Sequence, residues 1–221
     1  MATYSIISVN TNGYDKAYNN ADANSKENIL FTDRDHHVTG WKQVRCTTDK
    51  EHPFNDVFKY RWNMLDYVDT DYVVWVDGSK EVAGTFKPLI DEMERTCADV
   101  MVINHPTRNN VYDEYRTWCK CRNYDKIKAF SWLSYMHESG VDIHHSGLIE
   151  ASCFIMKRTK LAEAFSKNVW KELHHFDDKN VERLDQTVVS FVLNKMRDLN
   201  VLRKTWVSFK FLRGHWNHPM K

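Results

Sequence analysis

Apolar residues along the chain fall into two patterns, short continuous runs and longer segments in which they recur every three or four positions. The continuous runs predict strands at Tyr4–Val9, Asn28–Thr32, Tyr72–Val76, Asp99–Asn104 and Leu148–Met156. The helical spacing predicts Phe54–Leu65, Lys87–Cys97, Val111–His137, Thr159–Phe176 and Leu184–Leu199, followed by an extended run at Thr205–Phe211. Apolar strands that alternate with helices favour a mostly parallel sheet covered on both faces. We therefore expect one α/β domain over residues 1–221.

Short polar segments directly follow several of the predicted strands. In chain order they are Asn10-Thr11-Asn12, Asp33-Arg34-Asp35, Asp77-Gly78-Ser79 and His105-Pro106. Ligands of open α/β sheets bind beyond the carboxyl ends of the strands, so these segments are candidates for a binding crevice. Asn, Asp and Gly are also the residues with which any chain turns. The pattern alone therefore fits a ligand site and ordinary turns equally well.

The strongest local signal is the acidic end of the strand Tyr72–Val76. Asp77 follows the buried run, Gly78 allows the backbone to approach a ligand, and Ser79 projects to the same side as Asp77. Oxygen ligands of this kind suit Mn²⁺ or Mg²⁺. The alternative is an aspartate that merely caps the strand in a turn. Asp69 and Asp71 precede the strand, and we interpret them as a solvated turn between helix and strand.

Charged residues elsewhere have both a functional and a structural interpretation. Glu150 lies in an otherwise apolar strand, which is costly unless the carboxylate is paired or used, so it is either an acceptor-side base or nucleophile or a residue at an open strand edge. Asp185 and Gln186 open a predicted helix, where they can face a sugar or simply complement the helix dipole. The hypotheses for these positions stay open at this point.

His105 and Arg108 follow another strand end. They can meet a donor phosphate or an acceptor, and the alternative for Arg108 is an ion pair with Asp113 or Glu114.

Composition and charge narrow the function classes. The chain has 221 residues, of which 42% are hydrophobic, 28% charged and 13% aromatic, as expected for one globular domain. The net charge of +1 gives no basic face for nucleic acid. A local cluster of cations or a metal can still bind an anionic small molecule.

The cysteines and the apolar segments indicate in which cellular compartment the protein is expected. The five cysteines are an odd number without metal-site spacing, which favours a reducing environment. No signal peptide begins the sequence, and no apolar run approaches the about 20 residues that cross a bilayer. We expect a soluble, cytoplasmic protein without a membrane span.

Several motifs together resemble the GT-A glycosyltransferases over most of the chain. The strand ending in Asp77 and Ser79 is similar to their Asp-x-Asp element, with Ser79 in place of the second carboxylate. Tyr60 and Arg61 hold the places of a tyrosine and an arginine on the helix before that strand in retaining enzymes related to glycogenin. The remaining matches are an Asp-Gln motif and a terminal His-to-Lys motif, at Asp185, Gln186, His215 and Lys221.

Further segments extend the resemblance. Residues 105–114 and 149–158 also resemble a plant and bacterial GT-A group long classed as a domain of unknown function. The size and the lack of an anchor are similar to those of small GT-A enzymes of large algal viruses, which extends the expectation to a viral origin. The terminal motif departs from the pattern because His218 replaces a glycine. The related motif continues further, so we expect this chain to be the catalytic part of a longer polypeptide.

The resemblance implies a metal-dependent transfer of sugar from a UDP-sugar to a glycan or glycoprotein acceptor, with retention. It implies Mn²⁺ or Mg²⁺ held by Asp77 and His215, and catalytic roles for Asp185, Gln186 and Glu150. The residues expected at the donor are Asn10, Thr11, Asp33, Arg61, Ser79, His105, Arg108 and Lys221.

Two alternatives compete with this hypothesis. A sugar nucleotidyltransferase would need a glycine-rich phosphate loop after the first strand, and residues 11–20 are not one. A non-catalytic carbohydrate-binding module would use the aromatic residues without binding a donor or a metal.

Overall fold

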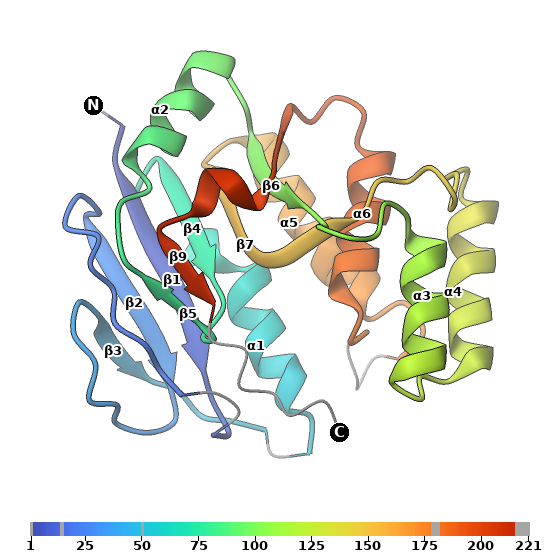
Figure 1. Ribbon diagram of the computed structural model, residues 1–221, viewed down its shortest axis with the longest axis horizontal. Helices are drawn as coiled ribbons and strands as arrows, with labels where there is room; N and C mark the ends of the chain where they lie inside the picture. The colour runs from blue at the N-terminus through green and yellow to red at the C-terminus, as the bar shows by residue number, and fades with distance from the viewer. Residues whose placement is uncertain (1, 14–15, 50, 178–181, 215–221) are drawn as a thin grey trace.

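A seven-stranded sheet forms the centre of the computed structural model, which describes residues 2–13, 16–49, 51–177 and 182–214 (Figure 1). The strand order is β3-β2-β1-β4-β7-β6-β8. Only β7 runs antiparallel to its neighbours, so the expected mostly parallel sheet is confirmed. The strands are β1 (Tyr4–Asn10), β2 (Glu27–Thr32), β3 (Lys42–Arg45), β4 (Tyr72–Val76), β6 (Val100–Asn104), β7 (Ile149–Lys157) and β8 (Val201–Lys204).

Helices and short elements cover both faces of this sheet. They are α1 (Pro53–Trp62), α2 (Lys87–Thr96), α3 (Val111–Cys121), α4 (Lys126–Glu138), α5 (Lys160–Leu173), α6 (Asp185–Lys195) and the 3₁₀ helices η1 (Met64–Asp66) and η2 (Trp206–Phe209). Helices α1, α5 and α6 pack on one face, whereas α2 and η2 pack on the other.

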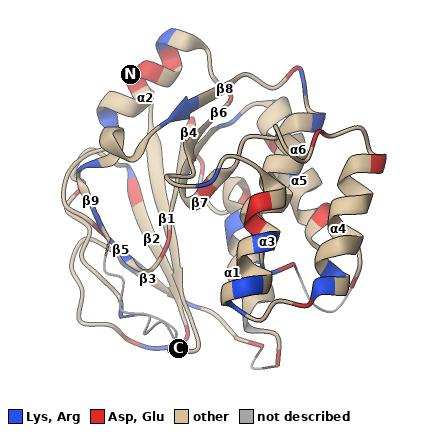
Figure 2. Ribbon diagram, turned by 45° about the vertical axis from the view of Figure 1, so that its right-hand side comes forward, with Lys and Arg blue, Asp and Glu red and all other residues tan. Residues whose placement is uncertain are grey.

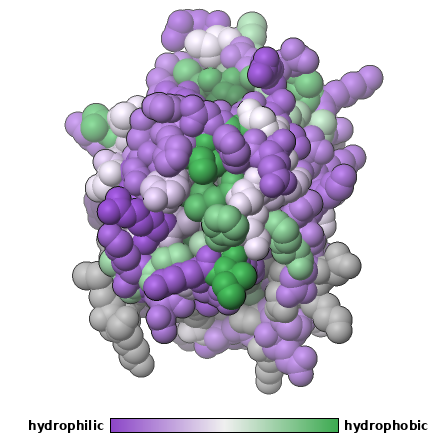
Figure 3. Space-filling model, turned by 90° about the vertical axis from the view of Figure 1, so that its right-hand side faces the viewer, coloured by the Kyte–Doolittle hydropathy of each residue, from purple (hydrophilic) through white to green (hydrophobic). Residues whose placement is uncertain are grey.

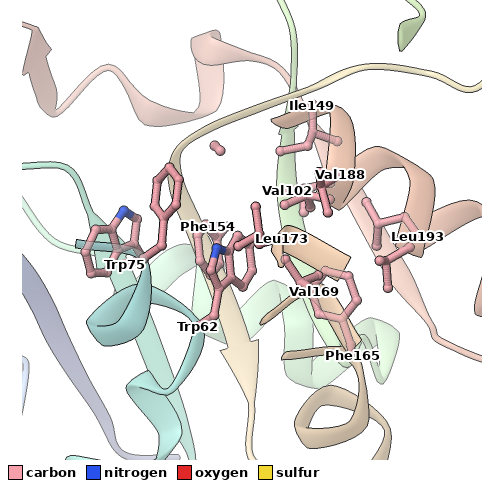
Figure 4. Close-up of a cluster of buried hydrophobic side chains, with 14 of the residues drawn as sticks. Trp62, Trp75, Val102, Ile149, Phe154, Phe165, Val169, Leu173, Val188 and Leu193 are labelled. Atoms are coloured by element: carbon pink, nitrogen blue, oxygen red, sulfur yellow. The ribbon is translucent and has the colours of Figure 1, made fainter. Parts of the chain in front are cut away.

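Strand β4 shows how the sequence serves both faces. Successive side chains of a strand point to opposite sides. Val73 and Trp75 therefore join the cluster under α1, α5 and α6, and Val74 joins the cluster under α2. In the first cluster, the ring of Phe154 stacks on Trp62 at 5.0 Å between centroids (Figure 4). Strands buried on both sides explain why their sequences are apolar throughout.

A second, two-stranded sheet stands beside the main one. It pairs β5 (Lys80–Val82) with β9 (Leu212–Gly214) in antiparallel fashion, with Lys80 opposite Gly214. The tight turn Asp77-Gly78-Ser79 joins β4 to β5, and the backbone N–H of Lys80 donates to the carbonyl of Asp77 at 3.0 Å. The far end of the described chain thus returns to the strand that follows Asp77.

Two predicted elements need correction. The segment Val111–His137 is two helices, because Asp125 caps α4 by accepting from the backbone N–H groups of Ile127 and Lys128. The prediction of an extended run at Thr205–Phe211 was wrong. This segment contains the 3₁₀ helix η2, in which Trp206 and Phe209, three positions apart, both pack against the sheet and Val207 stays exposed.

None of the helices in the described ranges is both long enough and apolar enough to cross a bilayer.

Candidate functional site

The strand order places a switch point beside β1. The chain leaves β1 for β2 and β3 on one side and returns to β4 on the other. In open α/β sheets the ligand crevice lies at such a point, beyond the carboxyl ends of the strands. Asn10 ends β1 and Asp77 follows β4. A Cβ on Gly78 would lie 2.8 Å from the carbonyl oxygen of Val9, so only glycine lets this turn sit against the end of β1.

Arg61 joins two candidate carboxylates at this point. Its side chain is 6% exposed, and its two terminal nitrogens form ion pairs with Asp77 and Asp185. The guanidinium also lies over the rings of Phe58 and Trp75, at 5.1 and 4.8 Å from their centroids. Burial alone would lower the pKa of Arg61, but the two carboxylates outweigh it and raise the pKa. The three residues, predicted separately from different segments, form one triad around the buried Arg61.

Asp77 keeps part of its carboxylate accessible. One oxygen, Oδ1, accepts from Arg61 and from the indole N–H of Trp75, the latter at 2.8 Å. The side chain is 29% exposed, so Oδ2 can reach a ligand or ion. Ser79, two residues on, lies half-buried in the same turn.

Asp185 and Glu150 are carboxyls with raised pKa values. For Asp185, burial and then the charge of Asp77 raise the pKa, against the opposing effect of Arg61. For Glu150, burial and again Asp77 raise the pKa, whereas Ser152 and Lys80 oppose the shift. Three carboxyls and two cations therefore share this site. Perturbed carboxyls with a shared charge partner are a mark of functional sites.

A distortion of β7 explains the position of Glu150. Its register with β6 shifts between Val102 and Ile103, so that Phe154 pairs with Val102 but Glu150 pairs with Ile103. Bulges of this kind bend a strand and redirect its side chains. The backbone N–H of Asp77 still donates to Ser152 on the same strand at 2.8 Å. Glu150 thus lies just beyond the point where β4 ends.

A second network reaches Gln186 through Glu114, which the sequence indicated only as a possible ion-pair partner of Arg108. Glu114, on α3, has no exposed surface. Its carboxylate accepts from the side-chain amide of Gln186 and, at 2.8 Å, from the indole of Trp118. It also forms an ion pair with Arg108. The structure therefore has the ion pair that was the alternative for Arg108, and the same carboxylate orients Gln186.

His105 lies at the end of β6 next to this network. Its Nδ1 accepts from the backbone N–H of Arg108 at 3.0 Å, and its Nε2 lies 2.8 Å from the Arg108 guanidinium. Burial, and then the charge of Arg108, lower the pKa of His105 to about 4. The ring is therefore neutral at pH 7 and faces Arg108.

The ends of β1 and β2 meet as expected. Asp33 accepts from the backbone N–H of Asn12 at 2.9 Å. Burial would raise the pKa of Asp33, but this bond and Arg34 outweigh it and lower the pKa. The hydroxyl of Thr11 and the side-chain amide nitrogen of Asn12 are buried without a hydrogen-bond partner among the described residues. Buried polar groups are usually paired, so these two are suited to a ligand.

Only some of the residues of the metal hypothesis belong to the described part of the chain. His215 and Lys221 lie outside the described residues. Within the described ranges, no three His, Cys, Asp or Glu side chains gather as a metal site would require. Asp77 and Ser79 can supply oxygen ligands, so a divalent ion would also need ligands from elsewhere, such as a diphosphate. Over the helices and strands that Figure 2 presents, cationic and acidic residues are interspersed.

Some residues of this site could have been found from sequence and others could not. Trp75 stands two positions before Asp77, so the strand period places both side chains on one side. The contact between buried Glu114 and Gln186 joins residues 72 positions apart. No periodic pattern marks such pairs.

Comparison with models of known protein families gave no match, and comparison with curated protein sequences gave none either.

Proposed function

We propose that this chain is a metal-dependent glycosyltransferase of the GT-A type that transfers a sugar from a UDP-sugar to a hydroxyl acceptor. The observation that carries the proposal is the triad of Arg61, Asp77 and Asp185 at the switch point of a mostly parallel sheet. Each member stems from a separate segment that resembles a GT-A motif. A likeness of isolated motifs does not require that they meet, so their convergence supports the proposal.

The charge of the site suits a cation and a diphosphate. Asp77, Asp185 and Glu150 face Arg61 and Lys80, which leaves a surplus negative charge when all are ionised. A divalent ion bound at Asp77 would relieve this surplus and supply Lewis-acid stabilisation of the departing diphosphate. The ion would bind Oδ2, because Arg61 and Trp75 hold Oδ1. Mn²⁺ and Mg²⁺ accept such oxygen ligands.

The reaction breaks the bond between the anomeric carbon and the diphosphate oxygen, which leaves with the electron pair. The acceptor hydroxyl oxygen forms the new bond to that carbon and loses its proton. Asp185 and Gln186, at the first turn of α6, would bind sugar hydroxyls or stabilise the positive charge on the carbon. Glu150, whose pKa is raised, suits the transfer of the acceptor proton. Retention of configuration is carried over from the resemblance.

The nucleotide side of the proposal rests on the ends of β1 and β2. The buried hydroxyl of Thr11 and the amide of Asn12 can bond a ribose or base, next to Asp33. Strand β9 ends at Gly214, which pairs with Lys80. Lys80 is close in sequence to Asp77. This return of the chain supports a role for His215 and Lys221 at the diphosphate, and that role stays a prediction.

The test is release of UDP from a panel of UDP-sugars, with Mn²⁺ or with EDTA. We expect metal-dependent turnover in the wild type and a loss of about a hundredfold or more in Asp77→Asn, as when a group that stabilises a developing charge is removed. Asp71→Asn is the matched control. Asp71 is exposed at the opposite end of the same strand, and belongs to the literal Asp-x-Asp of the sequence. A folded wild type that turns over none of the donors refutes the proposal, as does equal loss in both variants.

A further inference from the structure

A shallow pocket lies between the first turns of α4 and the residues that follow α5. Its volume is about 300 Å³, at the small end of the range for ligand sites. Two apolar and four polar residues line it: Ile127, Phe176, Asp125, Lys128, Ser131 and Asp177. It therefore has room for a small ring with polar substituents rather than for a whole nucleotide-sugar.

The apolar part of the pocket is an anchored aromatic ring. Phe176 is 46% exposed, yet its ring packs edge-on against Trp132, with centroids 4.8 Å apart. Ile127, 78% exposed, adds an aliphatic side chain on α4. Figure 3 shows hydrophobic residues gathered in a narrow stripe on this side of the molecule, with hydrophilic residues on both sides. A ring held in place but open to solvent offers a flat surface to the C–H face of a sugar.

The polar part of the pocket favours a neutral ligand. Asp125 uses Oδ1 to cap α4, accepting from Ile127 N–H at 2.7 Å, and its Oδ2 can accept from a ligand hydroxyl. Asp177 adds a second carboxylate. The cation, Lys128, is already paired with Glu182 at 3.2 Å. Two carboxylates and one paired cation disfavour a phosphate and suit hydroxyl groups, which donate to carboxylates.

The pocket is connected to the proposed transfer site. Glu182, the partner of Lys128, also accepts from the backbone N–H of Leu184 at 2.9 Å. Leu184 directly precedes Asp185. The N-terminal ends of α4 and α6 lie at the same lower edge of the molecule as the carboxyl ends of β1 and β2 (Figure 1).

We propose that this pocket is an acceptor subsite that holds one sugar ring of a neutral glycan. The inference rests on the proposed function, which supplies the reason for a glycan near Asp185. The pocket takes part only in binding, and the sugar ring in it is not the one that reacts. The ring stacks on Phe176 while one of its hydroxyls bonds the carboxylate of Asp125.

The experiment measures binding of defined neutral oligosaccharides (maltotriose, cellotriose, xylotriose and N-acetyllactosamine) by saturation-transfer NMR and calorimetry. We expect at least one to bind, and Phe176→Ala to weaken it about five- to tenfold, the scale of one lost aromatic contact. Ser131→Trp fills the pocket without removing Phe176 and should also abolish binding. Leu161→Ala is the control, since Leu161 is an equally accessible apolar residue at the start of α5.

The outcomes separate the subsite from the transferase. The subsite is overturned if none of the four glycans binds, if the affinity is unchanged in the two pocket variants, or if sulfated or phosphorylated sugars bind better than neutral ones. UDP release from the donor alone, measured in parallel, should be unchanged in the control variant Leu161→Ala. Glycan binding without any donor turnover would support the subsite and refute the transferase.

Discussion

Charged residues at the two ends of the parallel strands have different kinds of partners. At the amino ends of the parallel strands, Asp71, Asp99 and Arg158 have neutral partners of their own, beside the more exposed ion pairs Lys42–Glu27 and Lys157–Glu94. Asp71 accepts from the backbone N–H and hydroxyl of Thr3 at 2.7 and 2.8 Å. Asp99 accepts from a threonine hydroxyl at 2.7 Å and a backbone N–H at 3.0 Å. Arg158 donates to backbone carbonyls of residues 65–70.

At the carboxyl ends, the charged groups depend on one another. Arg61 is shared by Asp77 and Asp185, and the pKa values of Asp185 and Glu150 are raised by burial and by the charge of Asp77. A charge that is hydrogen-bonded by neutral groups stabilises the fold without a ligand. Crowded carboxylates cost free energy unless a ligand or ion neutralises them. The difference favours the carboxyl ends as the place of the proposed site.

Removing the shared cation should have the largest effect on stability. In Arg61→Ala, Asp77 and Asp185 lose their common partner in a largely buried site. We expect the free energy of unfolding to fall by about 3–5 kcal/mol, the usual cost of breaking a buried ion pair. Urea unfolding in EDTA measures it.

Two further variants sharpen that comparison of the edges. Adding Asp185→Asn to Arg61→Ala removes one stranded charge and should recover part of the lost stability. Arg158→Ala should cost less than Arg61→Ala, because its partners are backbone carbonyls. Equal losses in the two arginine variants would contradict the contrast.

Neutralising Glu114 should have an intermediate effect on stability and a specific effect on activity. Glu114→Gln keeps the shape of the side chain but weakens the bonds to Arg108 and Gln186, and hydrogen bonds to charged groups contribute about 1.5–3 kcal/mol each. We expect a stability loss of about that size together with slower UDP release, because Gln186 is no longer held.

Asp99→Asn, at the amino edge, is the control for Glu114→Gln. It should lose stability without losing turnover, since its partners are Thr159 and Asn200. Parallel losses of turnover in both variants would mean that Glu114 acts only through the fold.

The smallest expected effect is on the pH dependence of stability. The folded-state pKa of Glu150 lies above its ordinary value of 4.5. Between pH 4.5 and the raised value, the folded protein retains a proton that the unfolded chain has released, so stability falls as pH rises through this interval. Glu150→Gln removes the cost of ionising this carboxyl in the folded protein. In EDTA, it should be more stable than the wild type at pH 8 and equal to it at pH 4. A variant that is less stable at pH 8 would contradict the burial of this carboxyl.

The sequence predicted the fully buried strands well because their apolar runs are continuous. Strand β4 has the bounds that its apolar run predicts, Tyr72–Val76, and all five of its side chains are buried. Strands β3 and β8 carry charged, partly exposed residues, and β5 and β9 have three residues each. Such strands have no apolar run to reveal them. The segment Thr205–Phe211 misled because alternating apolar residues also fit a 3₁₀ turn.

The site was predictable where strand ends or motifs indicate it. Asp77 and Asp33 followed from the strand-end pattern, Arg61 and Asp185 came from motif resemblance, and the mutual contacts of Arg61, Asp77 and Asp185 needed the sheet order. The ion pair of Glu114 with Arg108 was one of the predicted alternatives, but its contact with Gln186, 72 positions away, could not be predicted. The pairing of distant buried charges depends on tertiary structure and leaves no local pattern.

The most direct test of the account is the melting temperature of the wild type and Asp77→Asn with UDP, with Mn²⁺ and with both. We predict a stabilisation that requires UDP and Mn²⁺ together, about 2.7 kcal/mol at a hundredfold excess over Kd, and that disappears in Asp77→Asn. A wild type that UDP and Mn²⁺ do not stabilise, or a variant stabilised as much as the wild type, would contradict the assignment of the carboxyl edge as a metal–diphosphate site.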